Sequence, residues 1–164
     1  MRTLFLLLAS LSVIAVQPPP DFSGRWAAEA APAGDMGSGW GPAITVTQDA
    51  ARLTVEYAFF GRGDMQPPLR FVYALDGSET KSTLMMGRGM QEQTSRAAWQ
   101  GSALVLTTRH GFTDPQTGKP DTVEVKRTLT LDSGSLVVET VRSGVLGGPP
   151  STSRTIYKKQ PPGL

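Results

Sequence analysis

The sequence predicts an all-β protein, a single up-and-down antiparallel β-barrel of about 8–10 strands. Apolar and polar residues alternate in nearly every segment after residue 20, which is typical of strands with one face in a core. Short turns rich in Gly, Asp and Ser separate these segments, and none of them has a helical period. A barrel is favoured over a sandwich or an open half-barrel, because closure removes the edge strands that an open sheet exposes.

The N-terminal region predicts export. One positive residue precedes an apolar run that ends in small residues, as in a secretory signal peptide cleaved after Ala15, with an uncleaved anchor as the alternative. The predicted organisation is a signal peptide at 1–15, a Pro-rich spacer at 16–20, the barrel at 21–159 and a disordered tail at 160–164. The expected location is the periplasm or the cell exterior.

Composition narrows the class of protein further. The chain has no cysteine, so a disulfide framework and a cysteine-linked lipid anchor are excluded. The 16 basic residues nearly balance the 14 acidic ones, which does not favour nucleic-acid binding. The apolar leader is shorter than the ~20 residues of a membrane span, so no stable membrane insertion is expected after cleavage. The remaining length suits one domain with a sizeable core.

The first predicted strand is Asp21–Glu29. Phe22, Gly24, Trp26 and Ala28 share one parity within it, so these residues face a core and the polar residues between them face solvent. We expect the later strands to close a sheet around Trp26.

The later strands are predicted in the same way, from alternation between turn residues. They are Ala43–Gln48, Arg52–Tyr57, Leu69–Leu75, Glu79–Met85, Gln91–Trp99, Ala103–Arg109, Val123–Leu131, Leu136–Arg142 and Thr152–Lys159. Among the hairpins joining them, Asp76-Gly77 is the strongest turn signal. The loops expected to frame the mouth, or its opposite end, are 30–42, 59–68 and 110–121.

Phe22-x-Gly24-x-Trp26 on a first strand resembles the Gly-x-Trp opening of lipocalins and related calycin barrels. The resemblance implies that Trp26 plugs the closed end and that Arg154, near the last strand, packs across it. On this resemblance, Gly24, Trp26 and Arg154 have a structural role in closing one end of the barrel. The chain is also similar to small exported bacterial proteins of unassigned function that open Asp-Phe-Ser-Gly-x-Trp and carry a Trp-x-Gly hairpin, here Trp99-Gln100-Gly101. This likeness implies a fold and no activity.

The final strand departs from a pattern seen in fatty-acid-binding proteins, whose last strand holds a carboxylate with an Arg-x-Tyr pair. Arg154 and Tyr157 are three residues apart, so they face opposite sides of a strand.

Arg127 is the leading candidate for a ligand contact. It shares the parity of Val125 and Leu129, so regular pairing would point its guanidinium into the barrel. A buried arginine keeps its charge and could anchor a ligand carboxylate in a barrel that holds one small molecule. The alternative is a bulge near Lys126 that leaves Arg127 in solvent.

The aromatic residues Tyr73, Trp99, Phe71 and Tyr57 complete the candidate cavity. The same positions are equally consistent with core packing around no cavity.

Catalytic and metal sites are not expected. Ser95, His110 and Asp114 could form a hydrolytic set, but nothing in the sequence places them together, and His110 is predicted at a loop edge. We predict no enzyme, no cofactor and no metal site. The methionines suggest packing at one rim rather than a copper site; they are Met36, Met65, Met85, Met86 and Met90.

The leading functional hypothesis is an exported lipocalin-like protein that binds a small apolar or amphipathic molecule in its barrel. One alternative is a protein–protein interaction or inhibitory module that uses its loops and holds no internal ligand. The other is an enzyme with an active site in the barrel.

Overall fold

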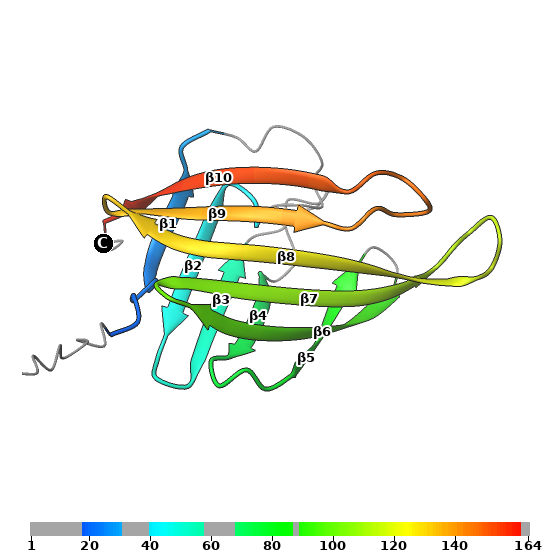
Figure 1. The fold of residues 1–164 in the computed structure, drawn as a ribbon, viewed down its shortest axis with the longest axis horizontal. Helices are drawn as coiled ribbons and strands as arrows, with labels where there is room; N and C mark the ends of the chain where they lie inside the picture. The colour runs from blue at the N-terminus through cyan, green and yellow to red at the C-terminus, as the bar shows by residue number, and fades with distance from the viewer. Residues whose placement is uncertain (1–17, 31–39, 58–67, 87–88, 162–164) are drawn as a thin grey trace, which may run out of the picture.

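A computed structural model describes residues 18–30, 40–57, 68–86 and 89–161. These residues form ten antiparallel strands in a nearly closed barrel, as the sequence predicts (Figure 1). The strands are β1 (Gly24–Ala28), β2 (Ala43–Gln48), β3 (Arg52–Tyr57), β4 (Leu69–Ala74), β5 (Thr80–Met86), β6 (Gly89–Gln100), β7 (Ala103–Thr113), β8 (Pro120–Asp132), β9 (Ser135–Arg142) and β10 (Ser151–Gln160). A search of the described residues finds no helix that could cross a membrane. The predicted signal peptide lies outside them.

The order of the strands in the sheet is β4-β3-β2-β1-β10-β9-β8-β7-β6-β5. The first and last strands therefore pair in the middle of the order, with Trp26 opposite Lys159 on one side and Ile44 on the other. Because successive strands alternate in direction, β1, β3, β5, β7 and β9 all finish at one end of the barrel, which we call the loop end. The opposite end, which carries the short turns, is the turn end (Figure 1).

The barrel has its seam between β4 and β5, so the hairpin predicted at Asp76–Gly77 is wrong. These residues do form a turn, but the backbone N–H of Leu75 donates to the carbonyl of Ala51, 2.8 Å away. This bond holds Leu75 beside the β2–β3 turn, and the chain does not turn back there to pair with β4. The two strands meet through a side chain, since the hydroxyl of Thr80 donates to the carbonyl of Val72 at 2.8 Å.

Several strands extend further than the sequence predicts. β7 continues to Thr113 and β8 begins at Pro120, so the loop expected at 110–121 is a short turn between these two residues. Apart from Phe112, the extra rungs at the rim carry polar, glycine and proline residues, so no apolar alternation marks a strand there. β10 likewise includes Gln160, which we expected in the tail.

The segment before β1 is fastened to the turn end by hydrogen bonds. The backbone N–H of Phe22 donates to Oε1 of Gln48 at 3.0 Å, and Nε2 of Gln48 donates to the carbonyl of Pro20 at 2.9 Å. The indole Nε1 of Trp26 donates to the carbonyl of Phe22 at 3.0 Å, and both rings are buried. Phe22 and Trp26 are thus buried and hydrogen-bonded to each other near this end of the barrel.

The structure corrects the packing expected for Arg154. Its side chain is exposed on the outer face, with Nε 3.8 Å from Oε1 of Glu139. Lys159 takes the position over Trp26 instead, with Nζ 5.4 Å from the ring centroid. Arg154 is separated from Lys159 by an odd number of positions, and therefore projects from the opposite face of β10.

Gly24 makes room for this contact. Its φ of 148° is rarely adopted by other residues, and a Cβ there would lie 2.8 Å from Cε of Lys159. The backbone conformation therefore favours a glycine, and the missing side chain leaves room for the lysine that covers Trp26.

Replacing Gly24 with alanine is expected to lower the free energy of unfolding by about 1–3 kcal/mol, the cost of a strained backbone conformation. The flexible Lys159 side chain can move away from the new methyl group. The double variant Gly24→Ala/Lys159→Ala should therefore be no more stable than Gly24→Ala in urea unfolding. If it regains the stability of Lys159→Ala alone, the loss comes from the lysine contact and not from backbone strain.

Candidate functional site

The inner surface of the barrel is divided into an apolar and a polar half. At the turn end, Phe22 stacks on Trp99 with ring centroids 6.0 Å apart, and Leu104, Leu129 and Leu136 are fully buried around the closed base. Towards the loop end, most of the buried polar side chains lie on adjoining rungs of β6 to β9. They are Gln93, Ser95, Thr108, Arg127 and Thr140.

Arg127 lies on the inner face and is 8% exposed. β8 runs without a bulge through Lys126, so Arg127 stands opposite Leu106 of β7 and Thr140 of β9. Residues opposite each other in a ladder share a face, and Leu106 and Thr140 are both buried. The alternative of a bulge near Lys126 does not occur.

The guanidinium of Arg127 lies over the ring of Trp40, with Cζ 5.2 Å from the centroid. Trp40 precedes β2 and is 1% exposed. The hydroxyl of Tyr157 donates to the carbonyl of Gly41 at 3.0 Å and so ties this part of the chain to β10. Trp40 is absent from the predicted site because it follows a Gly-rich stretch with no alternation. The only signal was a large aromatic residue in an otherwise small and polar loop.

Two buried donors beside Arg127 have no hydrogen-bond partner among the described residues. They are Nε1 of Trp40 and the hydroxyl of Tyr73, whose side chain is fully buried. Thr108 and Trp40 lie close enough to Tyr73 to act on its pKa, but neither contact has hydrogen-bond geometry. The hydroxyl of Thr108 is instead 3.0 Å from that of Ser95. A cation and two unsatisfied donors thus converge in the polar half.

Burial raises the pKa of all three tyrosines of the chain, and the charge of Arg127 opposes the rise in each case. For Tyr157 the pKa reaches about 12. All three phenols are therefore protonated at neutral pH. Those of Tyr73 and Tyr57 lie within electrostatic range of Arg127 as neutral groups that can donate.

His110 is a half-buried strand residue and not the loop-edge residue that we expected. It stands opposite Gln93 and Val123 on the inner face. Burial lowers its pKa, and the charges of Arg142 and Arg127 lower it further. His110 is therefore neutral at neutral pH and lies within electrostatic range of both arginines.

The residues of the predicted cavity fall into two places. Tyr73 and Tyr57 lie near Arg127, and Phe71 stacks on Tyr57 with centroids 5.7 Å apart. Trp99 belongs to the apolar base, where it stacks on Phe22. The structure thus brings four of the five candidates, including Arg127, into one neighbourhood and separates Trp99 from them.

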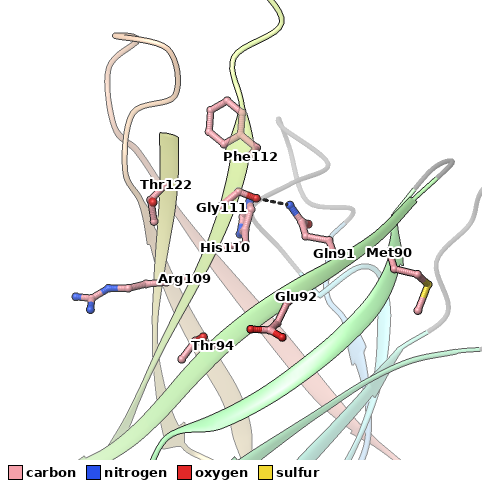
Figure 2. Close-up of a pocket in the computed structure, with 9 residues that line it drawn as sticks. All are labelled: Met90, Gln91, Glu92, Thr94, Arg109, His110, Gly111, Phe112 and Thr122. Carbon is pink, nitrogen blue, oxygen red and sulfur yellow. Dashed lines mark hydrogen bonds between the residues drawn. The ribbon is translucent and has the colours of Figure 1, made fainter. Parts of the chain in front are cut away.

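A hollow of about 600 Å³ opens between β6 and β7 near the loop end (Figure 2). None of the residues predicted for the cavity lines it. Its lining combines polar and apolar side chains with one glycine: Met90, Gln91, Glu92, Thr94, Arg109, His110, Gly111, Phe112 and Thr122. The strand periodicity alone cannot show this hollow, because it arises where two neighbouring strands separate.

The structure does not assemble the hydrolytic set considered from the sequence. The hydroxyl of Ser95 contacts Thr108, and the carboxylate of Asp114 accepts hydrogen bonds from the backbone N–H of Gln116 and the hydroxyl of Thr117. The described residues contain no group of three or more His, Cys, Asp or Glu side chains that could hold a metal ion. Of the methionines, Met90 is exposed, whereas Met36 and Met65 lie outside the described residues.

Replacing Tyr73 with phenylalanine is expected to raise the free energy of unfolding by about 1 kcal/mol, because it removes a buried hydroxyl that lacks a partner. Tyr157→Phe is the matched control. It should lower the same quantity by about 1 kcal/mol, because it removes the bond to Gly41. Urea unfolding compares the two, and an equal loss in both variants would mean that the Tyr73 hydroxyl is satisfied.

The tyrosines also predict an alkaline limit to stability. An acid whose pKa is raised by folding stabilises the native state below its unfolded pKa, which is about 10 for tyrosine. This contribution is lost as the pH rises through the native value, about 12 for Tyr157. Tyrosinate absorbance should therefore rise together with the loss of native circular dichroism. Ionisation of all three phenols near pH 10 in folded protein would contradict this.

Comparison with known proteins adds no relative. No protein-family model matches the chain, and no curated protein matches it. The candidate site therefore depends on the geometry described above.

Proposed function

We propose that the chain is an exported lipocalin-like protein that binds a small amphipathic molecule carrying an acidic group in the polar half of its barrel. Export is inferred from the predicted signal peptide at residues 1–15. The barrel fold is compatible with such a role, since small barrels of this kind can hold one small ligand.

The observation that carries the proposal is the convergence of donors at Arg127. A buried donor without a partner costs about 1–3 kcal/mol, so Nε1 of Trp40 and the hydroxyl of Tyr73 would both gain from a ligand oxygen. A carboxylate accepts several hydrogen bonds and donates none, and its bonds to a guanidinium are among the stronger ones in proteins. An acidic group matches this set better than an alcohol or an amine does.

The surroundings of this set favour an amphipathic ligand. The stacked rings of Tyr57 and Phe71 provide apolar surface near Arg127. A ligand with an acidic group and an apolar body would use both kinds of contact, which is the usual composition of a small-molecule site.

The alternative of an interaction module has less support. A docking surface is commonly a contiguous apolar patch. Among the described residues, the exposed large apolar side chains are Met90, Leu131, Val141 and Leu146, and no two of them stand opposite each other in a ladder. Scattered apolar residues of this kind are ordinary on a protein surface.

A dansyl-labelled long-chain fatty acid tests the proposal. Arg127→Gln should weaken its binding by roughly tenfold to a hundredfold, because a hydrogen bond to a charged group contributes about 1.5–3 kcal/mol. Arg154→Gln removes a positive charge from the outer face and should leave binding unchanged. Fluorescence titration measures the affinity, and circular dichroism establishes that each variant is folded.

The methyl ester of the same probe provides the second comparison. The wild-type protein should prefer the acid to the ester, and Arg127→Gln should lose most of that preference. Equal binding of acid and ester by the wild-type protein would rule out an acidic ligand group at Arg127.

A further inference from the structure

The ladder between β6 and β7 stops before either strand ends. Its rungs run from Gln100 opposite Ala103 to Gln93 opposite His110. Beyond this rung, Gly89–Glu92 pairs only with β5. The matching residues of β7, from Gly111 to Thr113, pair only with β8. The two strands therefore diverge into a fork in the barrel wall, and within the part of the chain that the structure describes neither edge has a neighbouring strand there.

The hollow of about 600 Å³ lies in this fork (Figure 2). One side chain reaches across it, because Nε2 of Gln91 donates to the carbonyl of Gly111 at 3.3 Å. The lining includes Glu92 and Arg109 from the outer face and His110 from the inner face. The hollow is therefore lined from both faces of the wall, and among the described residues the Gln91 side chain spans it.

The inner side of the fork lies near two arginines of the inner face. His110 stands at the last rung and lines the hollow. The charges of Arg142 and Arg127 both act on its imidazole. Arg142 stands opposite Val125, which is buried, so it belongs to the same inner face as Arg127. An anion that passes His110 thus approaches both arginines.

The rim of the fork offers apolar contacts on both faces. Phe112 lies two residues after His110, shares its inner face and is half-buried, whereas Met90 shares the outer face with Glu92 and is 65% exposed; both line the hollow. The charged residues there are already paired, since Arg109 contacts Glu124 at 2.7 Å and Glu92 contacts Lys81 at 3.3 Å. A ligand body at this position therefore meets apolar surface between two neutralised charges.

We infer that the fork between β6 and β7 is the entrance and the outer part of the binding site for an amphipathic anion. The acidic group passes His110 towards Arg127 and Arg142, and the apolar body rests on Phe112 and Met90. Entry displaces the Gln91 side chain from Gly111. This inference rests on the proposed function and adds to it the path and the position of the ligand. The size of the hollow is within the usual range for a small-molecule site, about 300–1,000 Å³.

A disulfide across the fork tests the inference. The chain has no cysteine, so Glu92→Cys/Gly111→Cys introduces the single pair. The ladder ends at Gln93 and His110, and these two residues form the first pair of positions beyond it, beside the contact from Gln91 to Gly111. The site tolerates the change, because a Cβ at Gly111 would make only an ordinary contact of 3.8 Å with the carbonyl of Asp121. Glu92 is exposed and loses only its surface ion pair.

The matched control is Arg96→Cys/Thr107→Cys, a rung within the closed part of the same ladder. Stopped-flow fluorescence measures the association rate of the dansyl-labelled fatty acid with each oxidised and reduced variant. We expect the oxidised fork disulfide to slow association by about tenfold or more, because binding then requires a closed path to open. Reduction should restore the rate in the same sample, and the control disulfide should have no effect.

A second variant tests the position of the ligand body without a crosslink. Phe112→Ala should weaken binding of the same probe by about tenfold, because a large apolar contact is lost at the rim and not in the core. If neither the fork disulfide nor Phe112→Ala changes binding, while Arg127→Gln still weakens it, the inference is overturned and the proposed function stands. If the wild-type protein does not bind the probe, both fall together.

Discussion

The pairing of β1 with β10 is the constraint on which the rest of the barrel depends. It joins the two ends of the described chain through a ladder on one side of β1, while β2 completes the other side. Trp26 then has neighbours on both strands and lies buried at the turn end. Gly24 and Lys159 complete this end, since the glycine leaves room for the lysine that covers the indole.

Regular strand pairing is interrupted at two other places in the barrel wall. The seam lies between β4 and β5, where a threonine side chain replaces a regular ladder. The fork lies between β6 and β7, where pairing stops at Gln93 and His110. Where two strands stop pairing, their backbone N–H and C=O groups need other partners. Near the rim of the barrel, water can supply them. The fork is therefore the place where a ligand could reach the interior.

The interior itself is asymmetric. The turn end is filled with aromatic and leucine side chains, which makes it a closed hydrophobic base. The loop-end half contains Arg127 over Trp40, with the phenols of Tyr57 and Tyr73 in its electrostatic range. These groups come from β3, β4 and β8 and from the segment before β2. The proposed site thus depends on the closure that brings these distant parts of the chain to one place.

The all-β class, most of the strands and most of the inward faces could be predicted from the residues alone, because the alternation of a strand is visible directly in its sequence. It placed Phe22 and Trp26 in the core, but it left the face of Arg127 open between regular pairing into the barrel and a bulge that leaves it in solvent. The folded chain was needed to show that the seam lies between β4 and β5, that Lys159 rather than Arg154 covers Trp26, and that Trp40 lies under Arg127. Those features depend on register and on contacts between residues far apart in the chain, which local alternation does not encode.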